Sequence, residues 1–226
     1  MKKLCFISTL LLGLSITLFA QGASEQAIRS SASHPAAIVA STTWTAAFAD
    51  LGGLDEVAHI APANLIHPPE YEITVRDVLK INHADYFIYA GYERMMQSMG
   101  NSIKKDSSAM VQINTNNSIE NVVEQAQKIA RLMGTEDKSK QRVASYVNAV
   151  EDGAQNVKDL GLDTLKVYCH AMQVYLAEDL GLEVAGTFGP APVSSAQITE
   201  VARGGYDLII DNIHNPLASP LLEVSP

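Results

Sequence analysis

The chain is poor in cysteine, which excludes a fold held together by disulfides. Its 226 residues include two cysteines. Cys5 lies in an apolar N-terminal run, and Cys169 stands alone in the rest of the sequence. If that run is removed as a signal, one thiol remains and no internal disulfide can form. The stability of the mature chain must therefore come from packing of its apolar residues, which make up 47% of the sequence.

Positive charge is also scarce. Sixteen Lys and Arg residues stand against 25 Asp and Glu residues, so the formal net charge is −9. An excess of acidic residues disfavours contact with the phosphate backbone of nucleic acids. We therefore expect no nucleic-acid partner, and the excess of acidic residues agrees with a cation as the bound ligand.

Beyond the first twenty residues the sequence has no long hydrophobic run. Two lysines precede an apolar run from Leu4 to Ala20, and small polar residues follow it. This is the plan of a secretory signal peptide, and roughly 16 apolar residues are fewer than the ~20 that a membrane span needs. The sequence predicts a signal peptide at 1–23, cleaved after Ala20 or Ala23, and a periplasmic product. No cysteine at this junction could take a lipid.

Several enzyme motifs are lacking as well. The sequence has no phosphate-cradling glycine loop, no GxSxG elbow and no HExxH helix. Cys169 precedes His170, but adjacent residues on a strand point to opposite faces, which is a poor geometry for a nucleophile and its base. We expect no enzymatic activity. A secreted enzyme using Cys169 is the least favoured alternative.

What the sequence does have is a regular alternation of strand-like and helix-like segments. Apolar runs predict strands, and apolar residues at intervals of three and four predict helices. Strands are expected at 37–41, 56–60, 86–90, 111–114, 165–169, 183–187 and 206–211. Helices between them are expected at 44–51, 75–82, 119–133, 171–180 and 196–203. This order predicts an α/β fold with mostly parallel sheets.

A longer helical pattern divides the strands into two groups. Its apolar residues recur at intervals of three and four through residues 137–160, which would form a helix about 36 Å long at 1.5 Å per residue. Such a helix suits a connector between two lobes. We therefore expect a flexible segment at 24–36, an N-terminal α/β lobe at 37–136, the connecting helix at 137–160 and a C-terminal lobe at 161–226. The C-terminal lobe has three predicted strands against four and is expected to be incomplete.

The stretch 66–91 combines a loop, a helix and a strand. His67 precedes Pro68 and Pro69, which remove two backbone donors and predict a stiff, exposed loop. Thr74 begins a capping-box pattern before the helix. In open α/β sheets ligands bind beyond the carboxyl ends of the strands. A histidine on a rigid loop beside such an end is well placed to touch a ligand.

This stretch also carries a family resemblance. PPEYEITVRDVLKINHADYFIYAG, from Pro68 to Gly91, resembles the PHEYEPTPSDVxxLxxADLxxYNG signature of the ZnuA/TroA-like proteins. These are periplasmic solute-binding proteins that feed zinc and manganese ABC importers. The likeness extends more loosely from Pro35 to the end of the chain. It departs at Pro69. The family has a metal-binding His at this position, directly before Glu-Tyr-Glu, whereas the histidine of this chain, His67, lies two residues earlier.

The resemblance implies a helix-linked binding protein that acts as a monomer. It implies capture of a divalent transition metal between the lobes, zinc foremost, with manganese or another such metal as the alternative. The metal would be delivered to an ABC transporter permease in the inner membrane. A second cargo stays open, namely a metal chelate such as cobalamin or a ferric siderophore. Trp44, Tyr71 and Tyr92 would then supply flat apolar surface.

The resemblance further implies where metal ligands lie. Counting from the Glu-Asn pair at 120–121 puts Asn114 at the family's second His. VYCHAMQVYLAEDLGLEVAG resembles the family's VxxHDAFxYFxxxYGLxxxG segment. It places Cys169 on the third His position and His170 where manganese-type members carry Glu. Imidazoles suit zinc, copper, iron or nickel, and a thiolate favours zinc or copper.

The resemblance implies a late aspartate ligand on a further strand, which we expect to be missing from the incomplete C-terminal lobe. Asp211 and His214, in DLIIDNIHNP, are the candidates to replace it. We therefore predict a metal site formed by His67, His170 and His214, with Asp211 next. Participation of Cys169, Asn114 or Glu70 is left open.

Structural roles compete with each of these assignments. His67 also fits an ordinary surface loop, His170 a position beside a helix N-terminus, and Asp211 and His214 an Asx turn before Pro216. Met95, Met96 and Met99 could bind Cu(I), although methionines at helical spacing are more typical of a core.

Overall fold

A computed structural model describes residues 37–225, without the side chain of Asn101. The predicted signal peptide at 1–23, its cleavage after Ala20 or Ala23, and the flexible segment at 24–36 lie outside the described residues. None of the helices within 37–225 has the length and apolar character needed to span a bilayer.

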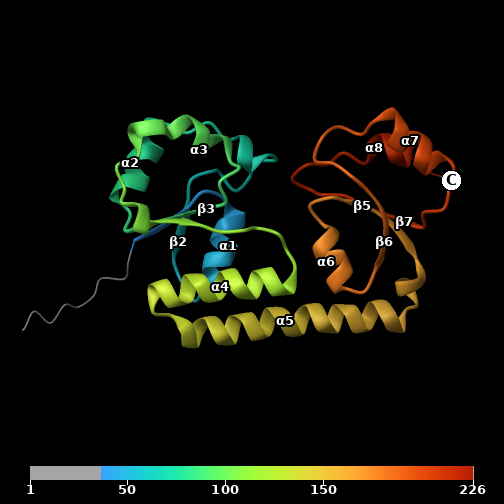
Figure 1. Cartoon of the computed structure of the whole chain (residues 1–226), viewed down its shortest axis with the longest axis horizontal. Helices are drawn as coiled ribbons and strands as arrows, with labels where there is room; N and C mark the ends of the chain where they lie inside the picture. Colours follow the sequence, from blue (N-terminus) through green and yellow to red (C-terminus); the bar gives the residue numbers. More distant parts are fainter. Residues whose placement is uncertain (1–36, 226) are drawn as a thin grey trace, which may run out of the picture. The chain divides into compact units, whose positions relative to one another are not determined.

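Two parallel sheets form the framework (Figure 1). The first has the strand order β2-β1-β3-β4, with β1 at Ile38–Ala40, β2 at Val57–His59, β3 at Tyr86–Tyr89 and β4 at Met110–Gln112. The second has the order β6-β5-β7, with β5 at Lys166–His170, β6 at Glu183–Phe188 and β7 at Leu208–Ile210. Every strand pair in both sheets is parallel. The predicted α/β fold with two lobes is therefore confirmed.

Helices follow most strands and cover the sheets. They are α1 at Thr43–Leu51, α2 at Val75–His83, α3 at Arg94–Met99, α4 at Ile119–Met133, α6 at Val174–Asp179, α7 at Ser195–Ala202 and α8 at Ser219–Leu222. Reciprocal capping boxes begin α1 at Thr42, α2 at Thr74 and α7 at Ser194. Gly134, with φ of 68°, ends α4 in the left-handed conformation that glycine adopts without strain.

The sheet of the first lobe is buried on both faces. Phe87 and Ile88, adjacent on β3, belong to two different hydrophobic clusters, as the alternation of side chains along a strand requires. Met95 and Met99 pack into the same cluster as Phe87 and are buried. The methionines at these two positions are therefore core residues.

The predicted connecting helix is α5, Glu136–Asp159, which spans 24 residues. It packs against α1 and α4 of the first lobe and α6 of the second. Its Arg142 donates to the backbone oxygens of Asp50 and Leu54 and to the carboxylate of Asp55 at 2.6 Å. These bonds fix the N-terminal half of α5 to the first lobe. The exact lobe boundaries given above stay a prediction.

A polar contact joins the lobes where α4 meets α6. The Asp179 carboxylate accepts the Ile119 N–H at 2.5 Å, at the N-terminal first turn of α4. Asn117 donates from its amide to Gln173 and accepts the N–H of Leu176. A carboxylate at a helix N-terminus is favoured by the helix dipole, so this contact holds the second lobe against the first.

Two local predictions were wrong. The segment predicted as a helix at 171–180 is helical only from Val174, because the chain leaves β5 through a turn in which the His170 Nδ1 accepts the Met172 N–H at 3.1 Å. The predicted exposed loop at His67 instead forms a 3-10 turn, Pro68–Glu70, with Pro68 buried.

Removal of the Asp179 carboxylate should weaken the contact between the lobes. We expect Asp179→Ala to lower the free energy of unfolding by about 1 kcal/mol, because a helix-terminal N–H loses its acceptor. Urea denaturation followed by circular dichroism measures this. Asp163→Ala, which removes an exposed carboxylate of the second lobe, is the control and should leave the midpoint unchanged. Equal effects of the two substitutions would contradict the assignment.

Candidate functional site

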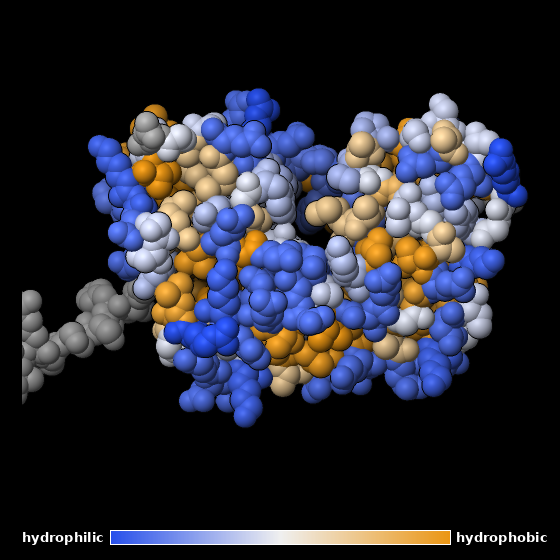
Figure 2. Space-filling view, in the orientation of Figure 1, coloured by the Kyte–Doolittle hydropathy of each residue, from blue (hydrophilic) through white to orange (hydrophobic). Residues whose placement is uncertain are grey.

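A cavity of about 770 Å³ lies at the carboxyl ends of both sheets. The segment that follows each of the seven strands contributes to its lining. In strand order from β1 to β7, these segments supply Trp44, His67, Tyr92, Asn117, Gln173, Pro190 and His214. In Figure 2 a hollow is visible in the upper middle of the view, bordered by hydrophilic and intermediate residues. Parallel pairing explains the convergence, since all carboxyl ends of a parallel sheet meet at one edge.

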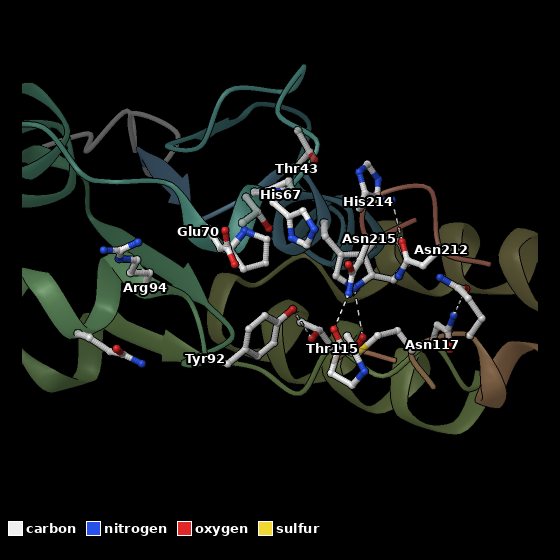
Figure 3. Close-up of a pocket in the computed structure, with 18 residues that line it drawn as sticks. Thr43, His67, Glu70, Tyr92, Arg94, Thr115, Asn117, Asn212, His214 and Asn215 are labelled. Atoms are coloured by element: carbon white, nitrogen blue, oxygen red, sulfur yellow. Dashed lines mark hydrogen bonds between the residues drawn. The ribbon is translucent and has the colours of Figure 1, made fainter. Parts of the chain in front are cut away.

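Two of the predicted ligands, His67 and His214, line this cavity. In Figure 3, His67 and Glu70 lie together, and His214 lies with Asn212 and Asn215 from the other lobe. His67 is half-buried at the start of the 3-10 turn, where its backbone oxygen accepts the Glu70 N–H at 3.1 Å. His214 is exposed, and its backbone N–H donates to the side-chain oxygen of Asn212 at 2.8 Å. Both imidazole side chains extend from loops whose backbones are held by hydrogen bonds.

His170, the third predicted ligand, is fully buried at the end of β5. Its Nδ1 accepts a backbone N–H, while its Nε2 has no hydrogen-bond partner within the described structure. The ring packs against Gly189, where a Cβ atom would come within 2.5 Å of Nε2. Burial lowers the pKa of His170 below 6.5, and the charge of Asp211 opposes this shift. The ring is therefore neutral at neutral pH, and because Nδ1 accepts a hydrogen bond, the ring proton lies on Nε2.

Asp211 serves the backbone of its own loop. Its carboxylate accepts the N–H groups of Asn212, Leu217 and Ala218 at 2.8, 2.9 and 2.9 Å. This is the Asx-type role that the sequence left open beside metal ligation. Within residues 37–225, no three His, Cys, Asp or Glu side chains stand close enough together to hold a metal ion. The set of His67, His170, His214 and Asp211 thus stays a prediction.

Cys169 points away from the neighbouring His170 into a separate hydrophobic cluster with Val167 and Ala177. It is fully buried. Burial, with a smaller contribution from the charge of Glu178, raises the pKa of the Cys169 thiol to about 11. The thiol is therefore protonated at neutral pH and is a poor nucleophile.

The aromatic residues predicted to offer flat surface divide into two groups. Trp44 and Tyr92 line the cavity, and both are held at Thr115: the indole N–H donates to its backbone oxygen at 3.1 Å, and the phenol oxygen lies 3.2 Å from its hydroxyl. Burial raises the pKa of Tyr92. Tyr71 lies outside the cavity lining and donates instead to Asp77 at 3.0 Å. The side chain of Asn114 accepts the Asn116 N–H and also lies outside this lining.

Glu93 is a residue that the sequence analysis missed. Its side chain is 1% exposed, and its carboxylate accepts the Ser41 hydroxyl at 2.5 Å and the N–H groups of Ala90 and Gly91 at 2.8 and 2.6 Å. It thereby joins the ends of β1 and β3 and fixes the turn that carries Tyr92. Its pairing with Ser41 spans 52 positions, so local sequence patterns gave no signal for it.

Solved structures resemble this arrangement over most of its length. The laminin-binding protein Lmb of Streptococcus agalactiae, described as a bifunctional adhesin with metal-transporting activity, matches with a TM-score of 0.62 over 84% of each chain at 18% identity. The Cd-bound and Mn-bound periplasmic metal-binding protein from Candidatus Liberibacter asiaticus match with TM-scores of 0.59 and 0.58 over 83% of each chain, at 16% and 14% identity.

This chain has the fold of the periplasmic metal-binding proteins. No protein-family model and no curated protein sequence matches it. The similarity to these proteins is thus one of fold, at 14–18% sequence identity. Within this fold, the part of the chain described here presents two histidines from different lobes to one cavity.

The inertness of Cys169 can be measured directly. At pH 8, iodoacetamide should modify the native protein about 100-fold more slowly than the urea-unfolded protein, because a thiol with a pKa of about 11 is far less ionised than a free thiol. The native rate should rise as the pH approaches 11. Mass spectrometry of timed samples gives both rates. Equal rates for native and unfolded protein at pH 8 would argue for an activated cysteine.

Loss of the Glu93 carboxylate should be costly. We expect Glu93→Ala to lower the free energy of unfolding by about 2–3 kcal/mol, because it leaves buried donors without an acceptor. Glu72→Ala is the control, since Glu72 forms only an exposed ion pair with Arg94 and should change stability little. Thermal and urea unfolding of both variants provide the test. A Glu93→Ala protein as stable as the parent would refute this role.

Proposed function

We propose that this protein is the substrate-binding component of an ABC importer. In this proposal it captures a divalent transition metal, zinc foremost, in the cavity at the carboxyl ends of its two sheets. It then delivers the ion from the periplasm to an inner-membrane permease. No covalent bond is made or broken, so the function consists of affinity and release.

The observation that carries the proposal is the position of His67 and His214. They belong to different lobes, and both line one cavity. Imidazole nitrogen suits zinc and the neighbouring transition metals. The fold shared with periplasmic metal-binding proteins supports the same class of cargo.

Further ligands are proposed from the second lobe. His170 packs against Gly189, the neighbour of the cavity-lining Pro190. It would bind a metal through Nε2 only by moving its ring proton to Nδ1, which breaks the hydrogen bond from the Met172 N–H. Asp211 would contribute a carboxylate only by giving up backbone hydrogen bonds. We therefore rank His67 and His214 first, His170 next and Asp211 last.

Substitution of the two cavity histidines tests this ranking. The chelator-treated mature chain should bind zinc with a stoichiometry near one in isothermal titration calorimetry. His67→Ala and His214→Ala should each weaken binding about tenfold or more, which corresponds to about 1.4 kcal/mol. Manganese should be titrated in parallel.

His83→Ala is the matched control, because His83 is an exposed histidine at the end of α2 and does not line the cavity. Its affinity should equal that of the parent. Zinc binding that survives both cavity substitutions but is lost in His83→Ala would exclude the proposed site. Stoichiometries far below one for every metal would contradict the function itself.

A further inference from the structure

The size of the cavity bears on the form in which a metal enters it. The cavity measures about 770 Å³, which is far more than a bare metal ion occupies. Pockets that bind organic ligands typically measure about 300–1,000 Å³. The cavity therefore has the dimensions of a site for an organic molecule.

The lining has the chemistry of such a site. Trp44 and Tyr92 are 46% and 50% exposed, and their polar ends are both held at Thr115. Fixed aromatic rings that remain open to solvent offer contact area at little entropic cost. The side chains of Asn212 and Gln97 add amide groups that can donate to or accept from a polar ligand.

Charge of both signs is present on the first lobe's side of the cavity. Glu70 and Arg94 both belong to the lining, and Figure 3 shows them on the same side of the view as Tyr92. The ion pair of Arg94 with Glu72, at 3.2 Å, is exposed and therefore weak, so the guanidinium is free to meet a ligand carboxylate. A ligand that places an amine beside Glu70 and a carboxylate beside Arg94 is an aminocarboxylate.

The number of metal-binding atoms in the cavity also favours an organic ligand that accompanies the ion. His67 and His214 supply two nitrogen atoms, whereas zinc takes four ligands and sometimes five. His170 and Asp211 are both engaged with backbone N–H groups and are not needed in this inference. The remaining coordination positions are filled by the amine and carboxylate of an aminocarboxylate and, in L-histidine, by its imidazole as well.

We propose that the metal enters this cavity as a complex with a small aminocarboxylate, and that His67 and His214 complete its coordination by displacing bound water. This inference rests on the proposed function and adds the identity of the cargo to it. The aromatic pair holds the organic part, and the imidazoles hold the ion.

The single tryptophan of the chain, Trp44, makes the cavity observable by fluorescence. The parent protein should be titrated with zinc chloride, with a 1:1 zinc–L-histidine complex, and with L-histidine alone. We expect the complex to bind at least about tenfold more tightly than zinc chloride. Native mass spectrometry should show one zinc and one L-histidine on each chain.

Tyr92→Ala should weaken binding of the complex about tenfold and weaken binding of zinc chloride far less. Tyr71→Ala is the matched control, because Tyr71 lies outside the cavity lining. Circular dichroism confirms that both variants are folded.

The outcomes separate this inference from the proposed function. If zinc chloride binds as tightly as the complex and no L-histidine is retained, the aminocarboxylate inference is overturned and the metal-binding function stands. If L-histidine binds equally well without zinc, the inference is also overturned, because the ion then plays no part. If neither form of zinc changes the Trp44 emission or remains bound, the proposed function fails together with the inference.

Discussion

All strand pairs in the two sheets run parallel, and this constraint decides where a ligand can be held. Each strand delivers the chain that follows it to the carboxyl edge of its sheet. Residues far apart in the sequence, such as Trp44, Tyr92 and His214, therefore line one cavity. The helices cover the sheets, and this edge is formed by loops together with the N-terminal parts of α1 and α3, which carry polar and aromatic side chains.

The loops of the cavity wall are held in place by buried and part-buried hydrogen bonds. Glu93 joins the ends of β1 and β3, and Thr115 anchors the rings of Trp44 and Tyr92. On the other side, Asp211 holds the loop that carries His214. The helix α5 and the contact of Asp179 with α4 connect the lobes. A helix shared by both lobes favours small adjustments over a wide hinge motion.

The fold was predictable from the sequence because each element has its own local signal. Helix α4, Ile119–Met133, matches its predicted range, since an apolar stripe lies between the Ser118 cap and Gly134. The site was predictable only in part. The positions of His67 and His214 follow from strand ends, whereas the burial of His170 depends on Gly189, and the role of Glu93 depends on the distant Ser41. Contacts between residues so far apart in the chain cannot be detected from the hydrophobic periodicity of a single sequence.

The most direct test of the account is to locate the metal itself. Crystals of the mature chain grown with zinc, measured on both sides of the zinc absorption edge, give the position of the ion by anomalous scattering. We expect one anomalous peak in the cavity, with ring nitrogens of His67 and His214 about 2.0–2.1 Å away. A peak at the exposed His83, or a cavity without zinc at saturating concentration, would contradict it.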